Sequence, residues 1–140
     1  MALMDGNKIF DKVGITGLLN LKGSKLAWRE ISASTKTLTY DEAGLLYYVT
    51  YAGTCAITLP ANTLALKGRW FLILQTVDQT LSVAAATVDT LIADGDIAAD
   101  SVAFSTSSHK AGGLFLVIGT GAAWAVVNMS VGCTMTVTTN

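Results

Sequence analysis

The sequence has few of the residues from which most active sites are built. Its 140 residues include one histidine and two cysteines, and Asp, Glu, Lys and Arg make up 14% of the chain, against about 25% in an ordinary soluble domain. Hydrophobic residues reach 51%. A monomer of this composition has few polar side chains with which to cover its surface. We therefore expect part of the surface to be buried against other copies of the chain or a large partner.

Strong charge and long hydrophobic runs are also missing. The net charge is −1, and no basic stripe is present that could release counterions from a phosphate backbone, so we expect no nucleic-acid partner. No apolar run approaches the roughly 20 residues that cross a bilayer, and the first residues lack the apolar core of a signal peptide. The sequence thus predicts no membrane partner and a chain that is made in the cytoplasm and not secreted.

The two cysteines, Cys55 and Cys133, lie far apart in apolar, strand-like stretches. This context favours small buried side chains, and a disulfide between them is the alternative.

From residue 36 onward, the sequence consists of short β-prone runs separated by turn signals. Residues 133–138 alternate between apolar residues and threonine, which is typical of a strand with one packed and one wet side. Residues 70–74 and 114–118 are continuously apolar, as in strands that are buried on both faces or lie in a subunit interface. Further strands are expected at residues 37–40, 46–51, 54–59, 101–105 and 123–128. Residues 81–99 are ambiguous because their alanines permit a helix; we interpret them as a strand, which includes the alternating residues 81–83, and a loop. This spacing predicts an all-β fold, an antiparallel β-sandwich or jelly-roll-like domain over residues 36–140.

Residues 1–35 differ, because glycines interrupt an apolar segment that has no clean period. Such a segment is suited to an extended N-terminal arm that inserts large side chains into a neighbour. The predicted interface residues are Ile9, Phe10, Ile15, Leu18, Leu19 and Trp28. The alternative is that this segment supplies an ordinary edge strand of the same sandwich.

No pattern predicts catalysis, a metal ion or a cofactor. His109 lies in a polar run without a nucleophile elbow or an orienting acid, which favours an exposed loop residue. Residues 119–121 (Gly-Thr-Gly) lack the third glycine and the helix of a dinucleotide-binding loop. The densest acidic cluster does not have the spacing of a calcium loop and is predicted to form turns; it consists of Asp89, Asp94, Asp96 and Asp100. We expect no enzyme activity.

The aromatic residues allow two interpretations. They could line a sugar-binding surface, or they could anchor the core and an interface, which is the commoner use of such side chains. The residues in question are Tyr40, Tyr47, Tyr48, Tyr51, Trp70 and Trp124.

Residues 47–127 resemble the small β-domains of bacteriophage virion surface proteins, both capsid decoration (cement) proteins and tail-fibre segments. An ordered series of short stretches carries the resemblance: Ile57-Thr58-Leu59-Pro60, Lys67-Gly68 before Phe71-Leu72-Ile73, Asp89-Thr90-Leu91-Ile92 before Gly95, and Leu116-Val117-Ile118-Gly119 before Trp124-Ala125-Val126-Val127. The resemblance implies a β-sandwich that forms trimers on a virion surface, and it supplies no active-site residue.

A short chain with an apolar arm is more similar to a decoration protein than to a long tail fibre. The resemblance thus implies a structural protein of the capsid surface, made in the host cytoplasm, whose partners are its own copies and the major capsid protein. The alternative is a tail-fibre or lectin-like module that binds a receptor or a glycan.

Overall fold

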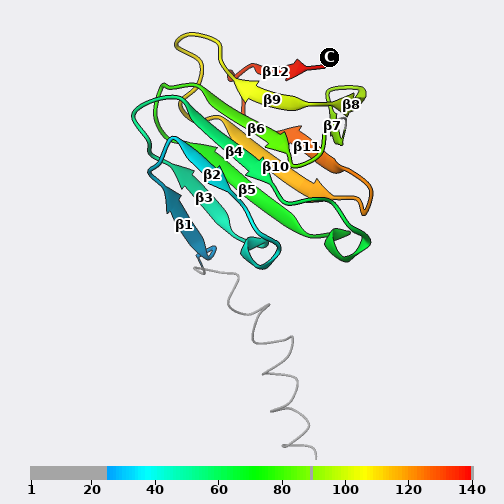
Figure 1. Cartoon of the computed structure of the whole chain (residues 1–140). Helices are drawn as coiled ribbons and strands as arrows, with labels where there is room; N and C mark the ends of the chain where they lie inside the picture. Colours follow the sequence, from blue (N-terminus) through cyan, green and yellow to red (C-terminus); the bar gives the residue numbers. More distant parts are fainter. Residues whose placement is uncertain (1–24, 89, 140) are drawn as a thin grey trace, which may run out of the picture.

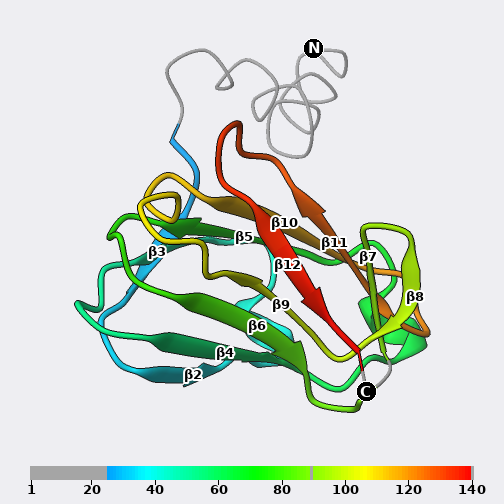
Figure 2. The same ribbon diagram turned by 90° about the horizontal axis from the view of Figure 1, so that it is seen from above.

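The computed structural model describes residues 25–88 and 90–139. They form two packed β-sheets (Figures 1 and 2). In order across the seven-stranded sheet, the strands are β1 (Trp28–Ile31), β3 (Leu46–Val49), β5 (Trp70–Gln75), β10 (Leu114–Gly119), β11 (Trp124–Asn128), β7 (Leu91–Ala93) and β8 (Asp96–Ala99). In the five-stranded sheet they are β12 (Met135–Thr138), β9 (Ser101–Phe104), β6 (Leu81–Ala85), β4 (Cys55–Leu59) and β2 (Thr35–Thr37). The predicted all-β sandwich is confirmed.

The strand directions correct the antiparallel expectation. Among the described residues, five of the ten strand pairings are parallel and five antiparallel. The first six strands alternate between the sheets, so that β1, β3 and β5 become parallel neighbours in one sheet, and β2, β4 and β6 in the other. Turn residues mark where a strand ends, but they do not tell whether the chain returns beside that strand or crosses to the opposite sheet. The sequence therefore predicted where the strands lie along the chain better than the direction of each strand relative to its neighbours.

The inner sides of both sheets form one core. In β5 and β10 every second residue is buried, as the period of two requires. The Phe71 ring lies between two other aromatic rings, with centroid distances of 6.2 Å to Tyr47 and 5.6 Å to Trp124. Phe104 and Phe115 come from opposite sheets and stack with centroids 4.0 Å apart. Large aromatic side chains thus join the two layers.

The ambiguous residues 81–99 contain β6, as expected, and then a hairpin of β7 and β8 where a loop was expected. Asp94 and Gly95 connect the hairpin strands, with φ values of 50° and 87°. Two successive positive φ angles are typical of a tight hairpin turn, and Asp and Gly are residues that adopt them. Asp96 Oδ1 also accepts a hydrogen bond from the Ala98 amide. The prediction that these aspartates form turns is confirmed for Asp94. Asp96 is instead the first residue of β8, Asp100 lies at a bend between β8 and β9, and Asp89 lies outside the described residues.

The described part of the chain has two short 3-10 helices between strands: η2 (Tyr40–Glu42) precedes β3, and η3 (Leu64–Leu66) precedes β5. No helix in residues 25–88 or 90–139 has the length and hydrophobicity needed to cross a bilayer.

Candidate assembly surface

The outer side of the seven-stranded sheet carries large apolar side chains. Between the buried residues of β5 and β10, the outward-facing residues are half-exposed. Strand register arranges them in rows across the sheet. The middle row consists of Trp28, Leu46, Leu72, Leu116 and Val127. It crosses five neighbouring strands without a charged side chain.

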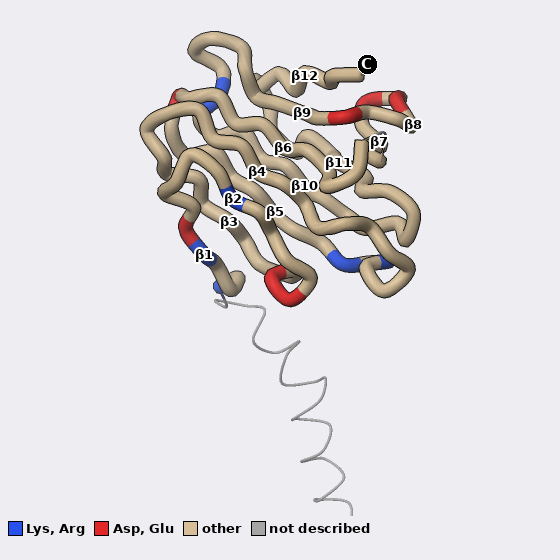
Figure 3. Tube along the Cα trace, viewed as in Figure 1, with Lys and Arg blue, Asp and Glu red and all other residues tan. Residues whose placement is uncertain are grey.

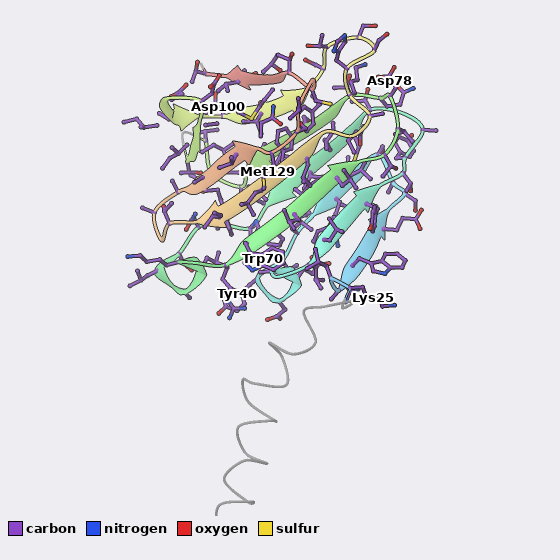
Figure 4. The ribbon with its side chains drawn as sticks, turned by 180° about the vertical axis from the view of Figure 1, so that it is seen from behind. Lys25, Tyr40, Trp70, Asp78, Asp100 and Met129 are labelled. Atoms are coloured by element: carbon purple, nitrogen blue, oxygen red, sulfur yellow. The ribbon has the colours of Figure 1, made fainter. Side chains whose placement is uncertain are left out.

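Two further rows flank the middle one. One consists of Tyr48, Leu74, Leu114 and Met129, and the other of Trp70, Ile118, Ala125 and Ile92. We call the residues of these three rows the apolar face. Figure 4 shows the molecule from behind, with Trp70 and Met129 labelled.

Exposure is highest near the sides of the apolar face. The side chains of Trp28, Val127 and Met129 are 54%, 48% and 53% exposed. Those at the centre are half-buried, because strands about 4.8 Å apart bring large side chains into mutual contact. At the β1 side, the rings of Trp28 and Tyr48 meet edge to face with centroids 5.7 Å apart. The described residues thus leave a continuous apolar surface accessible.

Charged residues lie around this surface rather than within it. Strands β3, β5, β7, β10 and β11 contain none, and Figure 3 shows them in tan, without blue or red. On edge strand β1, Glu30 is opposite Tyr48 in register, and its Oε1 accepts a hydrogen bond of 2.6 Å from the Thr50 hydroxyl. A surface without charge has little with which to bind a polar ligand, and its driving force is hydrophobic.

The outer side of the five-stranded sheet has a different composition. Its two rows contain only alanine, serine and threonine: Thr136, Ala103, Ser82, Ala56 and Thr35 in one row, and Thr138, Ser101, Ala84, Thr58 and Thr37 in the other. We call these residues the small-residue face. Small hydroxyl and methyl groups tolerate water and offer little apolar area for a partner.

The predicted arm lies mostly outside the described residues. This applies to Ile9, Phe10, Ile15, Leu18 and Leu19. Trp28, the sixth predicted interface residue, belongs to β1, which pairs in parallel with β3 as the edge strand of the seven-stranded sheet. Part of the segment assigned to the arm is thus a strand of the sandwich, and Trp28 extends the apolar face to its edge.

A pocket of about 380 Å³ opens beside the edge strands β1 and β2. Lys36 Nζ and Glu42 Oε1 form a 2.7 Å ion pair at its wall, and the Tyr47 hydroxyl donates a 2.7 Å hydrogen bond to the Glu42 carbonyl oxygen. Burial, with the nearby Glu42 carboxylate, raises the pKa of Tyr47 to about 12. The polar groups of Lys36, Glu42 and Tyr47 thus pair with one another at the wall of this pocket.

The candidates for chemistry remain separate from one another. His109 lies in an exposed loop, with Nδ1 3.0 Å from the Gly132 carbonyl oxygen. In the described part of the chain, no three His, Cys, Asp or Glu side chains come together in a way that could hold a metal ion.

Both cysteines are free. Cys55 is buried, and its burial raises the pKa of the thiol, which makes it less reactive. Cys133 is half-buried, and its Sγ lies 3.6 Å from the Ala111 carbonyl oxygen. The prediction of small packed cysteines without a disulfide is confirmed for Cys55, while Cys133 packs only partly against the core.

The aromatic residues do not form a single platform. Tyr47 and Trp124 are buried in the core, where Trp124 Nε1 donates to the Pro60 carbonyl oxygen at 2.9 Å. Tyr40 lies at the surface with the Arg69 guanidinium 4.7 Å from its ring centroid. Tyr48 and Trp70 belong to the apolar face.

The outward residues of β5 and β10 were not among the predicted interface residues. Their signal was the two continuously apolar runs, which we interpreted as strands buried on both faces or lying in an interface. The structure confirms that these strands are central in their sheet. Among the described residues, only the inner face of each strand is covered. No family model and no curated protein matches this sequence.

Proposed function

We propose that this chain is a structural protein of a bacteriophage virion, a capsid decoration protein that binds the head shell as an oligomer and stabilises it without catalysing a reaction. The observation that carries the proposal is the apolar face, three rows of large side chains on an otherwise complete sandwich. A surface of this kind marks a protein interface.

The proposed mechanism is the burial of area across joints between capsid subunits. A decoration protein binds the assembled shell and not the separated subunits, so its binding free energy is added to the stability of the shell. The sandwich provides a rigid body, and residues 1–24 provide the contact with the major capsid protein. The described chain begins at Lys25, next to β1, so this segment joins the sandwich at the edge of the seven-stranded sheet.

Deletion of residues 1–24 tests the capsid contact. Because β1 begins at Trp28, this deletion spares every strand that the structure describes, and we expect the variant to fold. Heads assembled from the major capsid protein encoded with this chain should bind the variant at least tenfold more weakly in a co-sedimentation assay.

Two substitution variants control for the deletion. Replacing Ile9, Phe10, Leu18 and Leu19 with serine should weaken head binding in the same way. Val88→Ser removes an apolar side chain that is 66% exposed on the sandwich and should leave binding unchanged. If the deleted chain binds heads as well as the full chain does, the proposed contact is wrong.

A receptor- or glycan-binding module of a tail fibre is the second candidate. The observation that favours it is the exposed Trp28 ring beside Tyr48, because aromatic rings stack on the apolar faces of sugars. Binding on a glycan array that is lost in Trp28→Ala would support this candidate over capsid decoration.

A further inference from the structure

We infer that the apolar face binds the same face of a second copy of this chain, so that two sandwiches pair face to face. The inference rests on the proposed assembly function and names the partner of that surface. The contact with the shell is then left to other parts of the chain.

The size of the apolar face fits such a pairing. Its width is six strands, β1, β3, β5, β10, β11 and β7, or roughly 24 Å at the usual strand spacing. Its length is about 20 Å, because each central strand contributes three alternate residues with their side chains. The area of the apolar face is therefore roughly 500 Å². A standard interface buries about 800 Å² per partner. It consists of an apolar core and a polar rim around this core. The apolar face supplies such a core, and charged residues at its edge, such as Glu30, supply a rim.

The chemistry of the face favours an identical partner over a different protein. Homodimer interfaces are more apolar than the interfaces of non-obligate complexes, and the three rows contain no charged side chain that would recognise a partner by charge. Shape gives a second reason. Two sheets pack face to face at a small angle that follows from their twist, and a second copy necessarily has the same twist.

The small-residue face is the natural internal comparison. It has the same alternation and a similar flat shape, but its Ala, Ser and Thr side chains bury little area in a contact. A lysine on this face should therefore remain in solvent. A lysine on the apolar face would be buried without a counter-charge, which is strongly unfavourable.

Sedimentation equilibrium of the full chain tests the pairing. We expect a mass twice that of the 14.6 kDa chain. Leu72→Lys, at the centre of the middle row, should raise the dissociation constant about 100-fold or more, and the matched control Ala103→Lys should not change it. Leu116→Thr replaces the residue opposite Leu72 with a good strand former and should weaken pairing in the same direction. Circular dichroism shows whether each variant is folded.

A monomeric or trimeric wild type, or a folded Leu72→Lys variant that still pairs, would overturn the inference. The deletion of residues 1–24 is expected to keep the double mass; a monomer in that variant would show that the N-terminal segment, and not the face, joins the copies. Head binding is measured separately. A double mass without head binding contradicts only the capsid function, and a monomer that binds heads contradicts only the pairing.

Discussion

The two outer faces of this sandwich have the same geometry and opposite composition. Both sheets alternate buried inward residues with accessible outward ones. Outward residues are Ala, Ser and Thr on the five-stranded sheet, such as Ala103, but are Leu, Trp, Tyr and Met at most positions on the seven-stranded sheet, such as Leu72. A sheet that faces water gains nothing from large apolar side chains there. This difference is why we propose a partner for the apolar face and solvent for the small-residue face.

The largest expected effect comes from damage to the interior that both faces share. A Cβ at Gly119 would lie 2.1 Å from the Leu66 carbonyl oxygen, a backbone atom that cannot move aside easily. Gly119→Ala should lower the free energy of unfolding by about 3 kcal/mol, measured by urea denaturation at fixed protein concentration. The matched control is Gly53→Ala, whose Cβ would have side-chain atoms of the Tyr51 ring, and no backbone atom, as its three nearest neighbours and should cost less than about 1 kcal/mol. Equal losses in both variants would contradict this account of the interior.

Making the small-residue face resemble the apolar face should create a second association surface. Ser82 and Ala103 are opposite each other on β6 and β9, and replacing both with leucine adds apolar area without touching the core. Each leucine that a neighbour covers contributes about 2 kcal/mol, so species larger than the wild-type oligomer should appear in sedimentation velocity. Replacing both with threonine is the control. If the leucine variant sediments like the wild type, the apolar composition of a face is not sufficient for association.

The edge beside the pocket belongs to neither face, so changes there should affect folding and leave association unaltered. Tyr47→Phe removes the hydrogen bond to the Glu42 carbonyl oxygen and should cost about 1 kcal/mol of unfolding free energy. The pKa of Tyr47 is raised from 10.0 to about 12, so the folded protein keeps a proton that the unfolded chain loses. This contribution to stability is complete below pH 10 and declines as the pH rises toward 12.

Urea denaturation at pH 8 and pH 11 measures the effect of Tyr47. The wild type should lose more stability than Tyr47→Phe between these two pH values. An identical loss in both proteins would rule out Tyr47 as the cause.

The smallest effect is expected from the ion pair at the same edge. Burial alone would raise the pKa of Glu42, but the hydrogen bonds from Lys36 and the Thr39 amide lower it below 4.5. A carboxyl whose pKa is lowered by folding stabilises the protein above that value, and this contribution is lost as the pH falls below it. Glu42→Gln should cost about 0.5 kcal/mol at pH 7 and show a smaller further loss at pH 3 than the wild type. Lys36→Met should lower the free energy of unfolding by a similar amount at pH 7. A Lys36→Met variant that is more stable than the wild type would contradict a stabilising role of the ion pair.

The sequence predicted the position of most strands because the period of two and the turn residues are local signals. The apolar runs at residues 70–74 and 114–118 correctly indicated central strands. The parallel pairings, such as that of β4 with β6, depend on which sheet the chain enters after each turn, and no residue in the turn encodes that choice. For the same reason the sequence could not show that Leu46, Leu72 and Leu116 form one row, because their register brings together residues from distant parts of the chain.

Oxidative cross-linking at the centre of the apolar face tests the central claim most directly. The centre of the six strands of the apolar face lies between β5 and β10, where Leu72 and Leu116 are opposite each other. A two-fold axis through this centre therefore brings Leu116 close to its own copy, and a disulfide requires Cβ atoms about 4 Å apart. In a Cys133→Ser background, Leu116→Cys is predicted to form a covalent dimer on mild oxidation, whereas Ala103→Cys on the small-residue face remains monomeric on a non-reducing gel. Cross-linking of Ala103→Cys with none at residue 116 would show that the copies meet through the other face and would contradict the account.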